Sequence, residues 1–441
     1  MENEERRFAF VISGAHGMDH FLKRSFPPLI PVWAAAFGFP LWQLGVLLGA
    51  QTFGSAVGQA PMGHLSDRYD RRLMLPTGIA LMGASFAVFP VLPAMDVLGF
   101  ETSIAGTTFN GQFVGMLAVM LVVGLGSSTL HPIGYPLISQ NVPERRKGTV
   151  LGMWGSARSF GEGVAPAFVG VGLLLTGWEE ILVVFGVVGL LYAAYLFITL
   201  GAFETRPPRS SAPESSTETN PAGRSSIRDA DRRLFLYPIL AVFVAFVLQI
   251  VATAGTTVFL PEFVTSEYGY SFSVSGLAVT PESTASFYYS VLLLTAGGVQ
   301  IGTGRLIDRY DPRHVLLGFL AVGASTLAVL SGTVLSPPVL FLVLVVLGGS
   351  LWGLNPARDA IVSEIAPAES EGRTFGYLWT GALVLSSASP AVVGWIGDAA
   401  GLRRAFLLIS VVVVLSAIPI GLLLSDRVYV DPGESERVDA E

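Results

Sequence analysis

The chain is poor in two kinds of residue on which many proteins rely, cysteine and charged residues. None of its 441 residues is Cys, and only 13% are Asp, Glu, Lys or Arg. The absence of cysteine excludes disulfide bonds and thiolate metal sites. The shortage of charge leaves too few polar side chains to cover a water-soluble protein of this length. The Gly-rich phosphate loop of the Walker type is also missing from the sequence, which excludes the ATPases built on that loop.

Apolar residues make up most of what is present. They account for 51% of the chain, and the mean hydropathy is +0.61. They form continuous runs rather than an alternating pattern, as expected for helices that need roughly 20 apolar residues to cross a bilayer. We therefore predict an all-α membrane protein with twelve transmembrane helices. Their approximate positions are 8–35, 43–64, 73–92, 112–139, 148–175, 179–203, 233–262, 287–307, 314–334, 338–364, 372–397 and 403–424.

The second half of the sequence repeats the first. The segment Gly63–Arg72, GHLSDRYDRR, recurs as Gly304–Arg313, GRLIDRYDPR, and Gly124–Pro132 likewise matches Gly348–Pro356. Internal repeats of this kind are common in membrane transporters. We therefore predict two pseudo-symmetric six-helix bundles, with about 17 extra residues in the loop 93–111 of the first bundle.

Composition divides the chain into four parts. Residues 1–203 and 233–424 are predicted to form the N-terminal and C-terminal bundles. Residues 204–232 between them are rich in Ser, Pro, Glu and Thr and cannot bury a core, so we predict a flexible cytoplasmic linker. The remaining segment, 425–441, is predicted to be an acidic cytoplasmic tail.

The predicted loops differ in charge between the two sides of the membrane. Among the Lys and Arg residues of the predicted loops, only Arg403 and Arg404 lie on the side opposite the two termini. Because loops rich in Lys and Arg stay in the cytoplasm, we predict a multi-pass protein of the cell membrane with both termini cytoplasmic. The basic residues in the loops on the side of the termini are Arg68, Arg71, Arg72, Arg145, Arg146, Lys147, Arg305, Arg309, Arg313 and Arg373.

The repeated segment resembles the signature that follows the second and eighth helices of the major facilitator superfamily. That signature reads Gly-x-Leu-x-Asp-Arg-x-Gly-Arg-Arg. The resemblance implies a twelve-helix transporter in which Asp67 and the arginines latch the two halves on the cytoplasmic side of the outward-open state. The alternative is that these charges only fix the topology. The matching residues are Gly63, Asp67, Arg68, Arg71 and Arg72 in the first copy and Gly304, Asp308, Arg309 and Arg313 in the second.

One position departs from that signature in both copies. Asp70 and Asp311 replace the second glycine. Each lies just before the next predicted helix, so we predict that both residues cap helices or shape turns.

Within the superfamily, the chain is similar to the fosmidomycin-resistance type of multidrug exporter. That type has Asp four residues after the histidine of its first helix, where this chain has His20 with Asp19 beside it. Superfamily members often carry an Arg on the fourth helix that is absent here, so Arg158 or the pair Lys23 and Arg24 would supply the buried positive charge. The similarity rests on His16, Pro27, Pro31, Gly45, Gln59, Gly63 and His131-Pro132.

Ionisable residues inside the predicted spans are the strongest candidates for a functional site, because a charge is costly in the bilayer unless it faces protein or water. On the first span, His16, Asp19, His20, Lys23 and Arg24 form one polar stripe. Asp19 can reach Lys23, and His20 can reach Arg24. We interpret the histidines and Asp19 as proton-coupling groups, and Lys23 or Arg24 as attracting an anionic group. The alternative is a self-neutralised ion pair whose basic side chains extend toward the membrane surface.

The fifth span carries Arg158 and Glu162, four residues apart. We expect them to form an ion pair that faces the central cavity, where it would contact substrate or take part in proton-linked switching.

The tenth span carries Arg358 and Asp359 just after Asn355-Pro356, which is the counterpart of His131-Pro132. A proline in mid-span frees a backbone carbonyl. We expect Asn355 to serve that carbonyl, and we keep His131 as a candidate for the substrate path.

These features predict a secondary transporter that moves a small organic solute by alternating access, with proton-coupled efflux as the favoured reaction. Import of a small organic anion and a transport-inactive membrane sensor are the alternatives. We expect the small-molecule substrate, protons and the lipid bilayer as partners of a chain that acts as a monomer. We expect no enzymatic activity, cofactor or nucleic acid, and no metal site, because His16 and His20 lack a third ligand.

Overall fold

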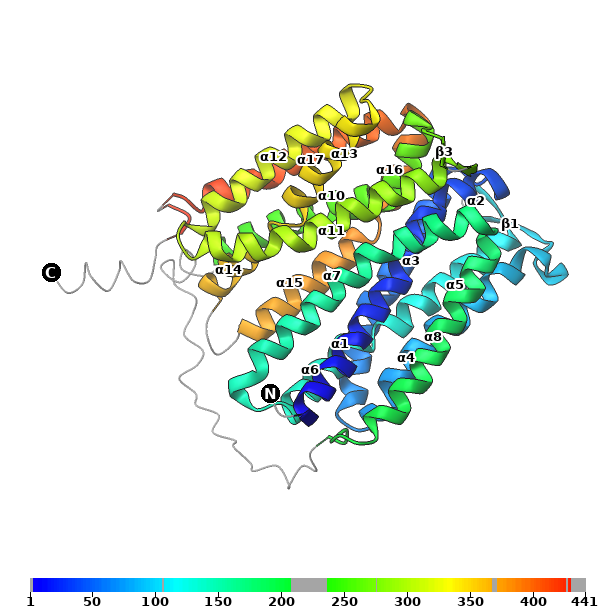
Figure 1. The fold of residues 1–441 in the computed structure, drawn as a ribbon. Helices are drawn as coiled ribbons and strands as arrows, with labels where there is room; N and C mark the ends of the chain where they lie inside the picture. The colour runs from blue at the N-terminus through cyan, green and yellow to red at the C-terminus, as the bar shows by residue number, and fades with distance from the viewer. Residues whose placement is uncertain are drawn as a thin grey trace.

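The structure is a computed structural model that describes residues 3–104, 107–207, 236–274, 276–366, 371–425 and 427–429. The predicted linker from residue 208 onward and most of the predicted tail lie outside the described residues. Within the described ranges the chain is built almost entirely from helices (Figure 1), which confirms the predicted all-α membrane fold.

The helices of the first half form six spans. The first span is not one continuous helix as predicted, because it is interrupted at Pro27 and Pro28 by the short 3-10 helix η1 (Pro27–Leu29). The fourth span is divided just before Pro132. The helices are α1 (Asn3–Arg24) and α2 (Ile30–Phe37), α3 (Leu41–Ser66), α4 (Arg71–Val88), α5 (Gly111–Ser127) and α6 (Leu130–Asn141), α7 (Glu144–Leu175) and α8 (Trp178–Leu200).

The second half follows the same order with six further spans. Its fourth span is divided just before Pro356, at the position that corresponds to Pro132, which supports the internal repeat. The helices are α10 (Tyr237–Tyr268), α11 (Pro281–Ile307), α12 (Pro312–Gly332), α13 (Pro337–Leu351) and α14 (Asn355–Ile365), α15 (Glu371–Ser386) and α16 (Ser389–Ala400), and α17 (Leu402–Leu422).

The extra residues of the first half lie where the repeat predicted them. Between α4 and α5 the chain forms the 3-10 helices η2 (Phe89–Ala94) and η3 (Asp96–Leu98) and an antiparallel hairpin of β1 (Glu101–Ile104) and β2 (Thr107–Asn110). The corresponding helices α12 and α13 are joined by residues 333–336 alone. A second hairpin, β3 (Phe272–Val274) with β4 (Leu277–Val279), joins α10 and α11.

Three of the twelve spans are less apolar than the rest. Nine spans in the described part of the chain are long and apolar enough to cross a membrane by composition alone, and those of α1, α3 and α7 are not among them. α1 and α7 carry the charged residues singled out above, and α3 is rich in Gly and Gln. Helices of this kind are expected where a bundle faces protein or water rather than lipid.

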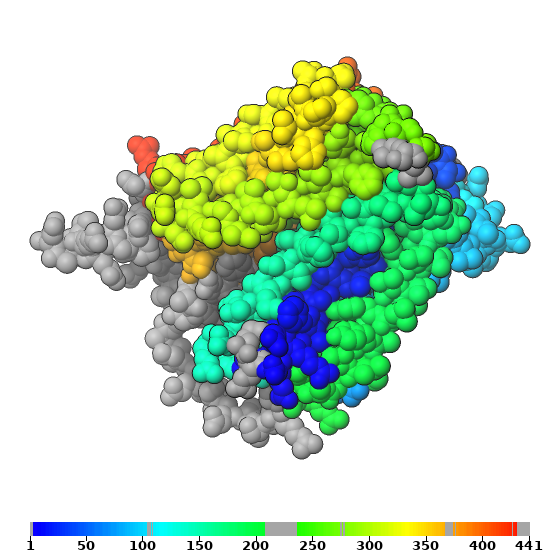
Figure 2. All heavy atoms as spheres, in the orientation of Figure 1, coloured from blue at the N-terminus to red at the C-terminus, as the bar shows by residue number. Residues whose placement is uncertain are grey.

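The two halves pack tightly at the end of the protein that carries the hairpins, here called the hairpin end. α3 contacts α16, and α7 contacts α11. A Cβ added to Gly45 of α3 would overlap the carbonyl oxygen of Pro390, and one added to Gly163 of α7 would overlap the Leu294 side chain. Small residues therefore let these helices approach closely. Figure 2 shows the atoms of α7 and α11 in contact along this seam.

The opposite end, here called the signature end because it carries Gly63–Arg72 and Gly304–Arg313, is open between the halves. A Cβ added to Gly152 of α7, Gly302 of α11 or Gly376 of α15 would meet no described atom within 4 Å. Figure 1 likewise shows α7 and α11 diverging toward the end at which α1 begins. The protein is therefore closed at the hairpin end and open at the signature end.

Both aspartates that replace glycine in the signature cap a helix, as predicted. An oxygen of Asp70 accepts a hydrogen bond from the Arg72 N–H at the start of α4 (2.9 Å), and Asp311 does the same for the Arg313 N–H of α12 (2.7 Å). Burial disfavours the charged form of Asp70. Hydrogen bonds from the Thr205 hydroxyl and the Arg72 N–H, with the charge of Arg206, outweigh it and hold the pKa of Asp70 below its ordinary value.

We expect Asp70→Ala to lower the free energy of unfolding by about 1 kcal/mol, because the first turn of α4 loses its cap. Asp70→Asn keeps an acceptor and serves as the control.

The lowered pKa of Asp70 means that its charge stabilises the folded protein at pH values above about 4, and that this stabilisation is lost as the pH falls further. Melting temperatures of wild type and Asp70→Asn should therefore converge as pH drops from about 5 to about 3. A constant difference would contradict this account.

Candidate functional site

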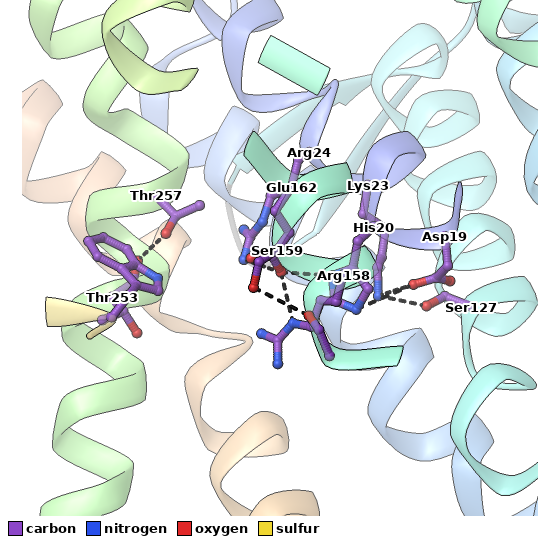
Figure 3. Close-up of polar contacts among 12 residues, drawn as sticks. Asp19, His20, Lys23, Arg24, Ser127, Arg158, Ser159, Glu162, Thr253 and Thr257 are labelled. Carbon is purple, nitrogen blue, oxygen red and sulfur yellow. Dashed lines mark hydrogen bonds and ion pairs between the residues drawn. The ribbon is translucent and has the colours of Figure 1, made fainter. Parts of the chain in front are cut away.

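α1 and α7 pack against each other directly, and this contact builds the polar site. A Cβ added to Gly161 of α7 would overlap the backbone of Gly17 of α1, so Gly161 is needed for the close approach. A Cβ added to Gly17 would make a tight contact with the Ala157 carbonyl oxygen (3.1 Å). The charged stripe of α1 and the pair Arg158 and Glu162 of α7 consequently lie together in the first half (Figure 3).

Glu162 is the centre of the site. Its Oε1 atom lies 2.7 Å from His20 Nδ1, 3.2 Å from Arg158 Nε and 3.5 Å from an Arg24 guanidinium nitrogen. The predicted pair of Arg158 and Glu162 is confirmed. His20 and Arg24, whose spacing suggested a mutual contact, instead both approach Glu162, because a carboxylate attracts two basic groups that would repel each other when charged.

Asp19 and Lys23 form a second ion pair beside the first. Lys23 Nζ lies 2.7 Å from an oxygen of Asp19, as the spacing predicted, and donates a hydrogen bond to the Ser127 hydroxyl at the end of α5 (2.9 Å). Asp19 is fully buried. Ser127 was not identified from the sequence, although it comes directly before the break between α5 and α6.

The imidazole rings form a row that reaches Glu162. The ring of His16 lies 5.3 Å from that of His131 on α6 and 4.9 Å from that of His20. His16 Nδ1 donates a hydrogen bond to the Trp154 carbonyl (2.9 Å). The Nε2 atoms of His16 and His20 are buried without a hydrogen-bond partner among the described residues. His131, which the sequence kept as a candidate for the substrate path, therefore belongs to the same cluster as the first-span histidines.

In the second half, Arg358 is enclosed rather than free. Its guanidinium donates two hydrogen bonds to one oxygen of Asp359 (2.8 and 3.0 Å). It also lies over the rings of Phe246 (4.2 Å) and Trp379 (5.1 Å), and cation–π contacts of this kind stabilise a buried guanidinium. The two aromatic partners were not identified from the sequence, because they lie on other helices.

The carbonyl freed by Pro356 has two donors, and only one of them was expected. Pro356 cannot bond the Trp352 carbonyl one turn earlier. Asn355 serves this oxygen, as expected, but through its backbone N–H (3.4 Å). The side chain of Gln300 on α11 donates to the same oxygen (3.1 Å), and this contact from a neighbouring helix was not identified from the sequence.

The signature residues make their contacts within their own half. Arg71 donates to Gln140 (2.7 Å), and Arg72 donates to the Phe197 carbonyl (2.9 Å). Arg313 pairs with Asp311 and Glu364 of its own half. Such contacts fit a protein that is open at the signature end, and the predicted latch in the outward-open state stays a prediction. The remaining signature residues lie at the C-terminal ends of α3 and α11 or in the turns that follow, and they are Gly63, Asp67, Arg68, Gly304, Asp308 and Arg309.

We expect Gln300→Leu to lower the free energy of unfolding by about 1 kcal/mol, because the Trp352 carbonyl would keep only the longer hydrogen bond from the Asn355 N–H. Gln59→Leu is the matched control, since Gln59 holds the equivalent place in the repeat and makes no hydrogen bond with the described residues. Thermal unfolding of the purified protein measures both variants. Equal losses in the two would show that this hydrogen bond is not the cause.

Comparison with known proteins places the chain in a family. The model of the Major Facilitator Superfamily matches residues 10–281 and 279–440. The transporter YfnC of Bacillus subtilis, an uncharacterized MFS-type transporter, is 24% identical over 428 residues, which cover 95% of this chain and 92% of that one. The hexuronate transporter of the same organism is 23% identical, covering 86% and 85%.

Two further similarities bear on function and fold. A homolog of the multi-drug resistance efflux pump PmrA from Lactococcus lactis is 24% identical, covering 81% of this chain and 80% of that one. The crystal structure of a bacterial homolog of the human lysosomal transporter Spinster, inward-facing and unoccupied, shares the fold with a TM-score of 0.72, 16% identity and coverage of 97% and 98%. The chain belongs to the major facilitator superfamily and is a secondary transporter of small molecules, not an enzyme.

Proposed function

We propose that the protein couples the movement of protons to that of a small organic anion, with the network around Glu162 as the coupling site. The observation that carries this proposal is the sharing of one carboxylate oxygen by His20, Arg24 and Arg158. The site as a whole holds three permanently basic side chains against two carboxylates, since Lys23 and Asp19 lie beside it. The excess of positive charge favours a negatively charged substrate.

Protonation of Glu162 would make the site ready for an anion. While Glu162 is ionised, its charge holds Arg158 and Arg24; once it is neutral, their guanidinium groups are free to bind a substrate carboxylate. Arg158 is the most accessible member, with 36% of its side chain exposed. In Figure 3 it extends toward Thr253 and Thr257 of α10, so a substrate held there would contact both halves.

The histidine row supplies a route for the proton. In space, the rings follow one another from His131 on α6 to His16 and then to His20, which contacts Glu162. The ring centroids are 5.3 Å apart for His131 and His16, and 4.9 Å apart for His16 and His20. Imidazole can both accept and release a proton near neutral pH. The unpartnered Nε2 atoms of His16 and His20 are the acceptors in this route.

This mechanism loads the proton and the anion together, which favours uptake driven by an inward proton gradient if the signature end is cytoplasmic. The hexuronate transporter is a relative whose name matches this substrate class. Proton-coupled efflux, favoured from the sequence through the fosmidomycin-resistance resemblance, is the second candidate, and the PmrA homolog supports it. A cationic substrate that competes with the proton for Glu162 would produce such an exchange.

We expect Glu162→Gln to reduce proton-driven accumulation strongly and to preserve exchange of substrate across the membrane, because the amide imitates the protonated acid. Proteoliposomes with an imposed pH gradient and labelled glucuronate or 4-hydroxybenzoate measure both. Accumulation should fall by about 10- to 100-fold, a common range for a coupling free energy. Glu144→Gln is the control, since Glu144 is exposed at the start of the same helix. Unchanged accumulation in Glu162→Gln would remove the coupling role, and outward flux would favour efflux.

We expect Arg158→Gln to raise the KM for an anionic substrate about tenfold, because the carboxylate loses a charge-assisted hydrogen bond. Arg404→Gln, which removes an exposed charge at the hairpin end, is the control. Uptake rates over a range of substrate concentrations measure both variants. An unchanged KM would mean that Arg158 does not touch the substrate.

A further inference from the structure

The first turn of α3 is capped from the other half of the protein. α3 begins at Leu41 after Pro40, which makes no side-chain cap. The carboxylate of Asp398, near the end of α16, accepts hydrogen bonds from the Leu41 N–H (2.9 Å) and the Trp42 N–H (3.0 Å). The first N–H groups of a helix lack partners within it and carry partial positive charge, so a carboxylate at this position is favourable.

Glycine residues bring α3 and α16 close enough for this contact. A Cβ added to Gly394, one turn before Asp398, would overlap the Leu41 carbonyl, and one added to Gly45 would overlap the Pro390 carbonyl. The two backbones therefore touch at the hairpin end, directly beside the carboxylate. Asp398 joins two segments that are separated by almost the whole length of the chain.

The equivalent seam between α7 and α11 is built differently. α11 is capped by its own Thr280, whose hydroxyl accepts a hydrogen bond from the Ser283 N–H (3.3 Å). The internal repeat places Leu174 of α7 where α16 carries Asp398. Of these two seams, the one between α3 and α16 is fastened by a carboxylate that crosses between the halves.

We propose that Asp398 is a positioning residue of the transport cycle that fastens the hairpin end in the closed state. Opening of the hairpin end requires α3 and α16 to separate there, which breaks both hydrogen bonds with Asp398. An interaction made in one of two states shifts the equilibrium toward that state by its own free energy. This role does not depend on which substrate or ion the protein carries.

The natural absence of cysteine makes the proposal directly measurable. Spin labels on Val97→Cys, in η3, and on Val334→Cys, between α12 and α13, report the distance between the halves at the hairpin end, because both side chains are exposed, at 71% and 76%. Labels on Tyr69→Cys and Tyr310→Cys, which are equivalent residues of the two signatures, report the signature end. Pulsed electron spin resonance in lipid nanodiscs gives the population of each distance.

We expect Asp398→Ala to raise the ratio of proteins open at the hairpin end to proteins closed there by about fivefold, comparable to the loss of a helix cap. The Val97–Val334 distance should lengthen and the Tyr69–Tyr310 distance should shorten together. Asp398→Asn, which keeps one acceptor oxygen, should shift the ratio less. Thr280→Ala, which removes a cap that does not cross the seam, should leave both distances unchanged.

The proposal is overturned if Asp398→Ala leaves both distance distributions as in wild type while the protein remains folded by thermal unfolding. It is also overturned if Thr280→Ala produces the same shift, because the effect would then follow from weakening any helix start at this end. A lower melting temperature with unchanged distances would assign Asp398 a purely structural role.

Discussion

The structure depends on one constraint, which is that a charge within a membrane must find its partner inside the protein. In the interior of the first half, α1 and α7 bring together five acidic and basic side chains, which are Asp19, Lys23, Arg24, Arg158 and Glu162. Their mutual pairing is possible because Gly17 and Gly161 let the two helices touch. Removal of one partner from such a network leaves an uncompensated buried charge, which is far more destabilising than loss of an exposed ion pair. The network therefore holds the first half together and keeps its charges at the centre.

The two halves share a fold and do not share this chemistry. The repeat places Ala382 and Ser386 in α15 where α7 carries Arg158 and Glu162. The second half has its own buried basic residue, Arg358. The rings of Phe246 and Trp379 pack against its guanidinium group, and Asp359 accepts its hydrogen bonds. Duplication thus supplied two bundles that can rock about a common axis, while the titratable groups were concentrated in one of them. On the proposed mechanism, the first half senses the proton and the second half supplies mainly hydroxyl groups.

Features that depend on neighbours along the chain could be predicted from the sequence, and features that depend on helix rotation could not. Hydropathy located the spans, and the displaced match between repeats located the insertion near 93–111. Spacing of four residues predicted the pairs Asp19–Lys23 and Arg158–Glu162. The approach of His20 to Glu162 was not predictable, because it requires the relative rotation of α1 and α7.

The same limit applies at Pro356. The sequence shows that the Trp352 carbonyl loses its helical partner, but a donor from outside the helix can come from any neighbour. Asn355, which is close in the sequence, could be predicted as a donor, whereas Gln300 reaches the same oxygen from α11 and could not. Asp398 is the extreme case, since its partners at Leu41 and Trp42 lie at the other end of the chain.

The proposed coupling site and the closed hairpin end are in direct physical contact, as a proton-driven change of state would require. The Ser290 hydroxyl of α11 donates to the Gly163 carbonyl, so the residue next to Glu162 is bonded to the opposite half. Tyr289 of α11 is fully buried and interacts electrostatically with Arg24 and Glu162. On the proposed mechanism, neutralisation of Glu162 releases Arg24 and so changes the charges that face Tyr289 across the seam. A state change needs such a differential contact, because a ligand that interacts equally with both states shifts nothing.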